Sequence, residues 1–239
     1  MDGIRLWLIA CTACGAVVTH AARAGEASNP DAPTPRPWQL WTAAQLLVSA
    51  PVGAYQPATD PSPPGLGLTA LLRSPRGGWS ARAGVDVSRY RTSGNVTLST
   101  RFGSFSAPST SATDVIWALA GAQWEATSIT AAPHVHVVAG IASMRTRVET
   151  ISAVRTNDTP FLQDDRTLFA TGVGGGIRWP IGTGGRFGLT LDADYRWTAP
   201  VSYLTSPVID STGIHYVPRR SSIEAVTGQI GLAARWGGP

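Results

Sequence analysis

The sequence predicts an all-β fold, an eight-stranded antiparallel up-and-down transmembrane β-barrel. Three observations predict it: apolar and polar residues alternate along many segments, long and tight connections follow one another in turn, and tryptophans gather at one end of the expected strands. No run of about 20 apolar residues could cross a bilayer as a mature helix. A membrane protein with this sequence would therefore cross as strands.

The composition agrees with a membrane protein and argues against a nucleic-acid partner. Charged residues make up 14% of the 239 residues, whereas about 25% is usual in soluble domains. All 19 basic residues are arginine, and the net charge is +4. These arginines are dispersed along the chain and do not form the basic stripe of a nucleic-acid-binding surface.

The alternation is clearest in the hairpin formed by Thr167–Trp179 and Arg186–Trp197, with the turn Pro180–Gly185 between them. Side chains alternate between the two faces of a strand. One face of the second strand is apolar: Phe187, Leu189, Leu191, Ala193, Tyr195 and Trp197. Its other face is small or charged: Arg186, Gly188, Thr190, Asp192, Asp194 and Arg196. A membrane barrel turns its apolar face to lipid and its polar face to the lumen.

The same reasoning predicts eight strands. In chain order they are Trp38–Ala50, Gly65–Arg73, Trp79–Arg91, Asp114–Glu125, Ala132–Arg147, Thr167–Trp179, Arg186–Trp197 and Ile223–Trp236. The connections between them alternate long, tight, long, tight, long, tight, long. Membrane barrels with both termini in the periplasm have this rhythm, because their periplasmic turns are short and their external loops are long. Eight strands close a barrel that side chains can fill.

Tryptophan placement supports this topology. Six tryptophans would lie at the periplasmic rim: Trp38, Trp41, Trp79, Trp124, Trp179 and Trp236. Membrane barrels carry aromatic girdles at the membrane–water interface, where the amphipathic indole ring is favoured. We therefore expect a periplasmic aromatic girdle from these residues.

The N-terminus is predicted to direct export. Residues 1–24 have the apolar stretch and the small-residue cleavage site, Ala22-Arg23-Ala24, of a signal peptide. Both cysteines, Cys11 and Cys14, lie in this segment, so we expect no disulfide in the mature chain. Residues 25–37 are rich in proline and are predicted to be a disordered lead-in. Residues 38–236 form the barrel, and residues 237–239 form a tail.

The chain resembles the small eight-stranded outer-membrane barrels of the OmpA/OmpX type over about Trp38 to Trp236. The last strand, Gln229–Trp236, is similar to the C-terminal signal of these proteins, although Gly237–Pro239 follows the aromatic residue that usually ends it. The resemblance implies a place in the bacterial outer membrane. It also implies assembly by periplasmic chaperones and the barrel-insertion machinery. It implies no particular activity.

The inward faces predict a polar network inside the barrel. Its charged members are Arg82, Asp86, Arg178, Asp192, Asp194, Arg196 and Arg235. The neutral side chains of Gln123 and Gln229 also belong to it. Because an isolated charge in a narrow lumen is costly, we expect Arg–Asp pairs across the interior. His134 and His136 share this face. Two histidines alone are too few ligands for a metal, so lumen packing is expected for them.

Arginines also gather in the outer half of the expected barrel. Guanidinium groups suit phosphates, and the outer leaflet would present lipopolysaccharide phosphates there. Arg145, Arg147, Arg219 and Arg220 are therefore candidate lipopolysaccharide contacts, with a generic solvated rim as the alternative.

The expected function is a non-catalytic outer-membrane barrel that stabilises the envelope or makes surface contacts through its loops, without a cofactor. One alternative is an enzyme that modifies lipid A, with His215, Ser221, Ser222 and Glu224 as candidates. Another is a secreted lipocalin-like barrel with an apolar ligand pocket. A ten-stranded barrel, in which Val96–Phe105 spans the membrane, and the oligomeric state are left open.

Overall fold

The computed structural model describes residues 38–53, 64–75, 77–100, 103–126, 131–151, 163–182, 184–210 and 213–236. It contains ten β-strands. They are β1 (Gln39–Val52), β2 (Gly65–Arg73), β3 (Trp79–Thr100), β4 (Gly103–Glu125), β5 (Ala132–Ile151), β6 (Gln163–Ile181), β7 (Phe187–Thr198), β8 (Val201–Asp210), β9 (Gly213–Ser221) and β10 (Glu224–Trp236). Within the described residues, no helix is long and apolar enough to cross a bilayer.

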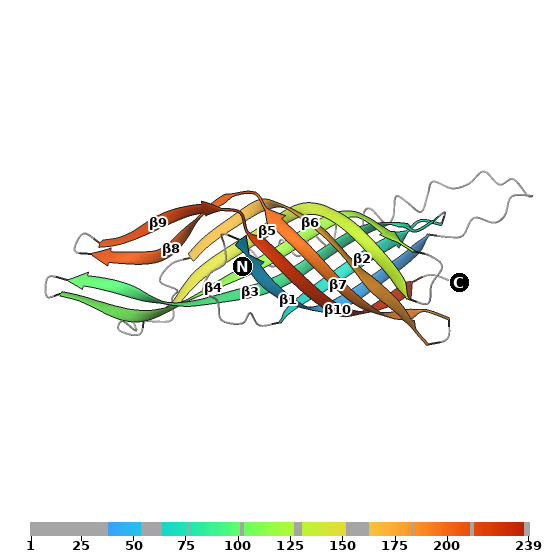
Figure 1. The fold of residues 1–239 in the computed structure, drawn as a ribbon, viewed down its shortest axis with the longest axis horizontal. Helices are drawn as coiled ribbons and strands as arrows, with labels where there is room; N and C mark the ends of the chain where they lie inside the picture. The colour runs from blue at the N-terminus through green and yellow to red at the C-terminus, as the bar shows by residue number, and fades with distance from the viewer. Residues whose placement is uncertain are drawn as a thin grey trace, which may run out of the picture.

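Eight of these strands close a barrel, as the sequence predicts (Figure 1). Each strand pairs antiparallel with its neighbours in the order β1-β2-β3-β4-β5-β6-β7-β10, and β10 returns to β1. The closing register joins Leu40 to Trp236 and Val52 to Glu224. The first and last barrel strands therefore lie side by side, and closure leaves no exposed sheet edge in the wall.

The two remaining strands form a hairpin beyond the barrel wall (Figure 1). β8 pairs with β9 and touches the barrel strands through one parallel bridge, between Leu98 and Ile209. The expectation that residues 199–222 form a long loop is therefore wrong. Pro207 and Pro218 interrupt the strand-like pattern, and the register shifts between Leu204 and Pro207.

β3 and β4 are much longer than expected. Residues 92–113, expected to be a connection, continue these two strands as a twisted hairpin, with Leu98 paired to Phe105. A ten-stranded barrel is therefore wrong, because the alternation in Val96–Phe105 comes from an extension of β3 and β4. The extension and the β8–β9 hairpin project from the same end of the barrel (Figure 1).

The opposite end carries the tight turns. In the turn between β6 and β7, Gly182, Gly184 and Gly185 have positive φ angles of 74°, 92° and 56°. This left-handed backbone is accessible to glycine at little cost, which allows the chain to reverse within a few residues. The start of β1 and the end of β10 lie at this same end.

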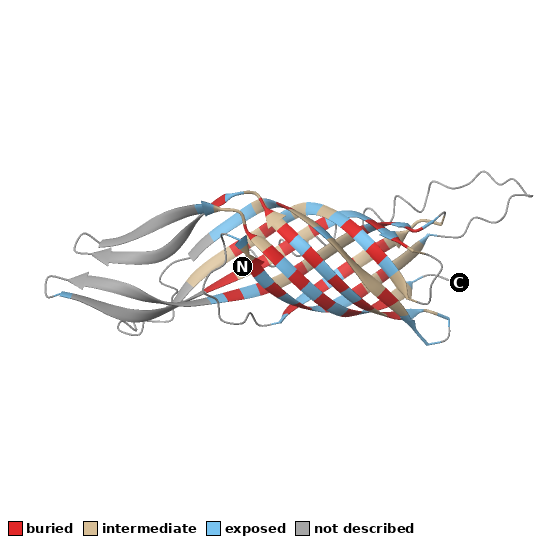
Figure 2. Ribbon diagram, viewed as in Figure 1, coloured by how far each residue is buried: buried red, intermediate tan, exposed pale blue. Residues whose placement is uncertain are grey.

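Burial alternates along most described stretches of the barrel strands, which produces the checkerboard of Figure 2. The alternation is weak along the glycine-rich part of β6, where residues 174–177 are all half-buried. The pattern is inverted relative to a soluble protein. Leu66 is 66% exposed and Leu232 is 64% exposed, whereas Asp192 and Arg196 are each 3% exposed. An apolar exterior around a polar interior is the arrangement of a barrel embedded in lipid. The lipocalin-like alternative is contradicted, because it requires the aliphatic faces to point inward.

The interior has two parts. The half nearer the tight turns holds the charged and polar side chains together with a small apolar cluster, formed by Trp41, Ala43, Leu71 and Ala233. The half nearer the long hairpins holds an apolar cluster: Tyr90, Val115, Trp117, Leu119, Ala142, Met144, Ala170, Val201 and Ile223. The predicted signal peptide, lead-in and tail, at residues 1–37 and 237–239, lie outside the described residues and stay predictions.

Candidate functional site

Two histidine–aspartate pairs reach across a strand in the polar half of the lumen. His134 Nε2 lies 2.6 Å from Asp192 Oδ1, and His136 Nε2 lies 2.9 Å from Asp194 Oδ1. The histidines belong to β5 and the aspartates to β7, so β6 runs between them. The registers align His134 with Gly176 and Asp192, and His136 with Gly174 and Asp194. The intervening glycines leave room for the two side chains to meet.

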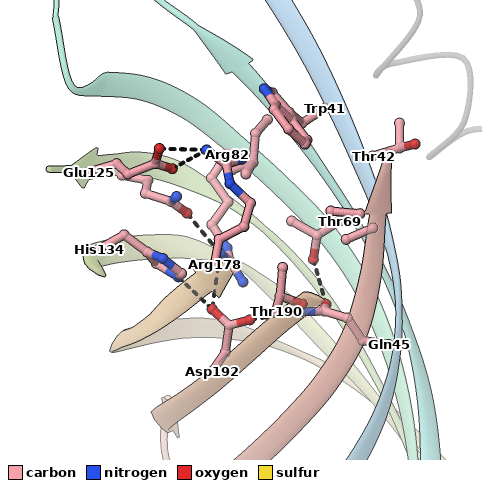
Figure 3. A pocket seen from close by; sticks show the side chains of 14 residues that line it. Trp41, Thr42, Gln45, Thr69, Arg82, Glu125, His134, Arg178, Thr190 and Asp192 are labelled. Carbon is pink, nitrogen blue, oxygen red and sulfur yellow. Dashed lines mark hydrogen bonds and ion pairs between the residues drawn. The ribbon is translucent and has the colours of Figure 1, made fainter. Parts of the chain in front are cut away.

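Asp192 is the centre of the first cluster, and it lies beside His134 and Gln45 in Figure 3. Gln45 Nε2 donates to Asp192 Oδ2 at 3.1 Å, and Thr69 donates to Gln45 at 2.8 Å. Arg82 lies 3.7 Å from Asp192 and donates to Gln123 at 2.8 Å. Because these residues come from β1, β2, β3, β4, β5 and β7, the cluster holds together strands that are distant in the sheet order.

Arg196 is the centre of the second cluster. Its Nη2 lies 2.6 Å from Asp86 and 2.8 Å from Asp194. Gln229 Nε2 also donates to Asp194, at 2.8 Å, and the Arg196 guanidinium lies 5.7 Å from the centroid of the Trp117 ring. The carboxylates are thus compensated by charge and by hydrogen bonds, as burial requires.

Trp41 and Arg178 occupy the end of the lumen nearest the tight turns. The Arg178 guanidinium lies 4.1 Å from the centroid of the Trp41 ring, within the range of a cation–π contact. Arg178 also pairs with Glu125 at 2.5 Å, and Glu125 pairs with Arg73 at 3.2 Å. The Arg235 guanidinium lies 5.9 Å from the centroid of the same ring and donates to the Gly184 carbonyl at 2.9 Å.

The structure places six of the seven predicted network charges in the buried interior, and Arg235 is half-buried at the rim. It also confirms the inward positions of Gln123, Gln229, His134 and His136. Glu125, which the predicted network does not include, is 2% exposed and accepts a hydrogen bond from Arg178. Its position two residues after Gln123 on β4 could have identified it, since inward residues recur every second position.

His134, His136 and Asp192 can each bring one potential ligand atom within 4.8 Å of the others. Each imidazole instead directs Nε2 to a carboxylate, and Arg82 lies beside Asp192. A neighbouring guanidinium opposes the addition of a second cation. These contacts fit lumen packing better than metal coordination.

The lumen is filled at the level of the polar network. A small cavity of about 20 Å³ lies among Trp41, Gln45, Thr69, His134 and Arg178 (Figure 3). This volume has room for about one water molecule. Ser49 and Tyr90, whose hydroxyls lie 2.7 Å apart, join the polar network to the apolar cluster above it.

Four of the six predicted girdle tryptophans are exposed near the tight turns: Trp38, Trp79, Trp124 and Trp236. Trp79 and Trp124 are direct cross-strand partners, and Trp179 is half-buried. The expectation that Trp41 joins this girdle is wrong. Trp41 is 6% exposed, because it lies in phase with Ala43 and Gln45 on the inward face of β1.

The outer rim carries charges on consecutive strands. Arg89 of β3 makes a bidentate pair with Asp114 of β4, at 2.5 and 3.1 Å. Arg145 of β5 makes a similar pair with Asp165 of β6, at 2.8 and 3.1 Å. The registers also align Asp114 with Arg145. We call these four residues the charged rung. Arg147 lies two residues beyond Arg145 on the same face, whereas Arg219 and Arg220 belong to β9, outside the barrel wall.

The proposed nucleophile–base group is not assembled by the described residues. Ser222 donates to Glu224 Oε1 at 3.0 Å, and Ser221 donates to a backbone carbonyl at 2.9 Å. The His215 side chain lies outside the described residues. Its backbone is six positions before Ser221 on β9, about 20 Å along an extended strand. An imidazole on the same strand cannot span that distance to Ser221.

The comparisons with known proteins find similarity in structure. No protein-family model matches the chain, and no curated protein matches it either. Ail, the attachment invasion locus protein of Yersinia pestis, is 11% identical, with 83% of this chain and 99% of Ail covered and a TM-score of 0.45. That structure is a complex with the heparin analogue sucrose octasulfate.

Two other solved structures match over a similar extent. Neisserial surface protein A is 11% identical, with 83% of this chain and 95% of that chain covered and a TM-score of 0.41. The outer membrane protease OmpT of Escherichia coli is 8% identical, with 85% and 98% covered and a TM-score of 0.45. Ail and Neisserial surface protein A belong to the small eight-stranded outer-membrane barrels that the sequence resembles. At these identities the similarity concerns the fold alone.

Proposed function

We propose that this protein is a plugged, non-catalytic outer-membrane barrel that holds the β3–β4 and β8–β9 hairpins at the cell surface. Its role would be to stabilise the envelope or to make contacts through these hairpins. The observation that carries the proposal is the filled lumen, in which Arg196, Asp86 and Asp194 bridge the interior. A barrel with such a lumen supports the two hairpins and does not conduct ions.

The two parts of the interior support a seal. Ions would have to pass the Arg178–Glu125 pair and the Arg196 cluster, and then the apolar cluster around Trp117. Moving a charged network aside would leave buried charges without partners, which costs several kcal/mol. The apolar cluster adds a second barrier, because an ion would lose its hydration there.

The hairpins supply the surface for contacts. They project from the end opposite the tight turns (Figure 1). In membrane barrels the short turns are periplasmic and the long segments are external, so this end is assigned to the outside. A hairpin that continues the strands of a closed wall is held in place by that wall, which favours a presenting role.

The enzyme alternative has less support. Ser222 is engaged with Glu224, and Ser221 with a backbone carbonyl. Neither serine has a histidine partner among the described side chains. A lipid-A-modifying enzyme would need a nucleophile and its base within hydrogen-bond reach.

The partners follow from the location. We propose export by the signal peptide, chaperoning in the periplasm, and insertion by the barrel-insertion machinery. Outer-leaflet lipopolysaccharide is the proposed partner of exposed arginines at the outer end, with Arg145, Arg147, Arg219 and Arg220 as candidates. Arg145 and Arg220 have surface exposure that fits this role.

Single-cysteine labelling of intact cells tests the orientation. Cys11 and Cys14 are the only native cysteines, and both are expected to leave with the signal peptide. Ser104→Cys on β4 and Asp210→Cys on β8 should react with a membrane-impermeant maleimide. Gly77→Cys, in a tight turn where an added Cβ meets nothing within 4 Å, is the matched control and should react only after lysis. Labelling of Gly77→Cys alone in intact cells would reject the orientation.

Planar-bilayer recording tests the plug. The purified barrel should insert without opening a steady conductance, whereas a general porin in the same bilayer should conduct. Steady channels that persist after repurification would reject the sealed lumen and favour a small pore.

A further inference from the structure

The charged rung is confined to one side of the barrel. The outward faces of β3, β4, β5 and β6 carry Arg89, Arg91, Asp114, Arg145, Arg147 and Asp165. Among these described side chains, four arginines against two aspartates leave a net charge of +2. In the described parts of β1, β2, β7 and β10, the outward face carries one charged residue, Glu224. A generic solvated collar would distribute its charge more evenly.

The position of the rung coincides with the edge of the lipid. On β3, Trp79 lies at the tight-turn end and Arg89 lies ten residues further along the same face. At about 3.3 Å per residue and a strand tilt of about 40°, this separation is about 25 Å along the barrel axis. The apolar band of an outer-membrane barrel is about 25 Å tall. Arg89 therefore lies where the headgroups of the outer leaflet begin.

The two ion pairs hold guanidinium groups at this level and leave them accessible. The Arg89 side chain is 44% exposed and the Arg145 side chain is 40% exposed. Arg91 and Arg147 lie one step further out, and both align with Ala112 of β4 between them. Among the described residues neither Arg91 nor Arg147 has an ion pair. Arg91 is exposed and Arg147 is half-buried, so both guanidinium groups can be reached from outside the wall.

A patch of small side chains lies on the outward face below the rung, toward the tight turns. Ala83, Ala120 and Ala139 are direct cross-strand neighbours on β3, β4 and β5, and Ala118 and Ala122 flank Ala120 on the same face. The row continues to Ala70 of β2, which pairs with Ala83, and Val87 and Ile116 lie between this patch and the arginines. Small side chains let acyl chains that descend from the level of the arginines lie close against the barrel.

From these two features together we infer a binding site for a phosphorylated glycolipid of the outer leaflet on the β3–β6 side. Arg91 and Arg147, supported by Arg89 and Arg145, bind its phosphate groups, and its acyl chains lie on the alanine wall. The inference rests on the membrane placement proposed above and narrows the lipopolysaccharide contact to one side of the barrel. It retains Arg145 and Arg147 and leaves out Arg219 and Arg220. Guanidinium groups suit this ligand because they bind phosphate oxygens in bidentate fashion.

Lipid titration of the barrel in detergent micelles tests the site. The probes are bisphosphorylated lipid A, the same lipid after dephosphorylation, and inorganic phosphate. Wild type should bind bisphosphorylated lipid A at least about tenfold more tightly than dephosphorylated lipid A, because charge-assisted pairs to phosphate are lost. Inorganic phosphate at millimolar concentration should not displace the lipid. Equal affinity for both lipids would show that the arginines do not bind the lipid phosphates, and would overturn the inference. Displacement by inorganic phosphate would show that the site binds phosphate and not the lipid.

Arg91→Gln/Arg147→Gln is the main variant, since neither residue has an ion pair with another described residue. It should weaken bisphosphorylated lipid A binding about tenfold. Arg91→Lys/Arg147→Lys should lose less affinity, because lysine keeps the positive charge but cannot bind phosphate in bidentate fashion. Arg186→Gln, an exposed arginine at the tight-turn end, is the control and should bind as wild type does. Unchanged binding by the double glutamine variant would overturn the inference.

Ala120→Phe tests the acyl-chain wall without changing charge. The enlarged side chain points to lipid, so the barrel should fold while bisphosphorylated lipid A binding falls several-fold. Ala44→Phe, on the outward face of β1, is the matched control and should have no effect. Equal binding by these two variants would remove the alanine wall from the site. Failure of these titrations would leave the cysteine-labelling and conductance results unaffected.

Discussion

His136 bonds to Asp194 across an intervening strand, with 2.9 Å between Nε2 and Oδ1. Gly174 of β6 lies between them in the register. A Cβ at position 174 would lie 2.2 Å from Asp194 Oδ1 and 2.8 Å from His136 Nε2. The pair exists because β6 places no side chain in its path. Gly176 permits the His134–Asp192 pair in the same way. At both positions a Cβ would also meet a backbone carbonyl of β7, Ala193 O at 2.6 Å from position 174 and Leu191 O at 2.3 Å from position 176.

Gly174→Ala should destabilise the barrel by about 1–3 kcal/mol, because the added methyl group forces the buried pair apart and also meets the Ala193 carbonyl. Urea unfolding in lipid vesicles, followed by tryptophan fluorescence, measures this change. Gly228→Ala on β10 is the matched control, since its Cβ would meet nothing within 4 Å. Equal urea midpoints of unfolding for the two variants would contradict the proposed role of Gly174.

Asp194→Asn should cost about 3–5 kcal/mol, because it removes the charge that compensates buried Arg196. Asp165→Asn makes the same chemical change in the charged rung, where the Asp165 side chain is 48% exposed. That variant should cost less than about 1 kcal/mol, because solvent screens exposed ion pairs. The same urea titration compares the two, and a similar cost for both would show that the interior network contributes little stability.

The closed wall predicts heat-modifiable migration on an SDS gel. Unheated protein from the outer-membrane fraction should run faster than boiled protein, because the β1–β10 closure leaves no edge from which SDS can open the sheet. Boiling should remove the fast band. Recovery from the soluble fraction with no shift would contradict a membrane barrel and would require the exposed apolar faces to be covered in another way.

The β3–β4 extension should be dispensable for folding. Replacing Asn95–Pro108 with Asn-Gly would join the paired residues Gly94 and Ser109 through a two-residue turn that suits a hairpin. The heat-modifiable band should remain, and the stability should change by less than about 1 kcal/mol, because this segment lies outside the barrel wall. Loss of the fast band would show that the hairpin takes part in assembly.

The sequence was most informative where side chains alternate without interruption. Arg82 and Asp86 on β3, and Asp192, Asp194 and Arg196 on β7, were placed on the inward face by parity alone, and the structure buries all five. The prediction was wrong where this two-residue alternation was not applied to every residue of a strand. Trp41 was grouped with the girdle by residue type, although its phase with Gln45 placed it inside. β8 and β9 were missed because their prolines and their pairing outside the wall weaken the two-residue pattern.

The sequence by itself determined the fold class, the number of barrel strands, the faces of most residues and the end that carries the tight turns. These properties follow from the two-residue period of a strand and from local turn chemistry. The tertiary structure alone decided which charges meet. Arg196 pairs with Asp86 of β3, and Arg178 with Glu125 of β4, because closure of the barrel brings distant strands face to face across the lumen. It also aligned Arg89, Asp114, Arg145 and Asp165 on consecutive strands, which depends on inter-strand register and on no local pattern.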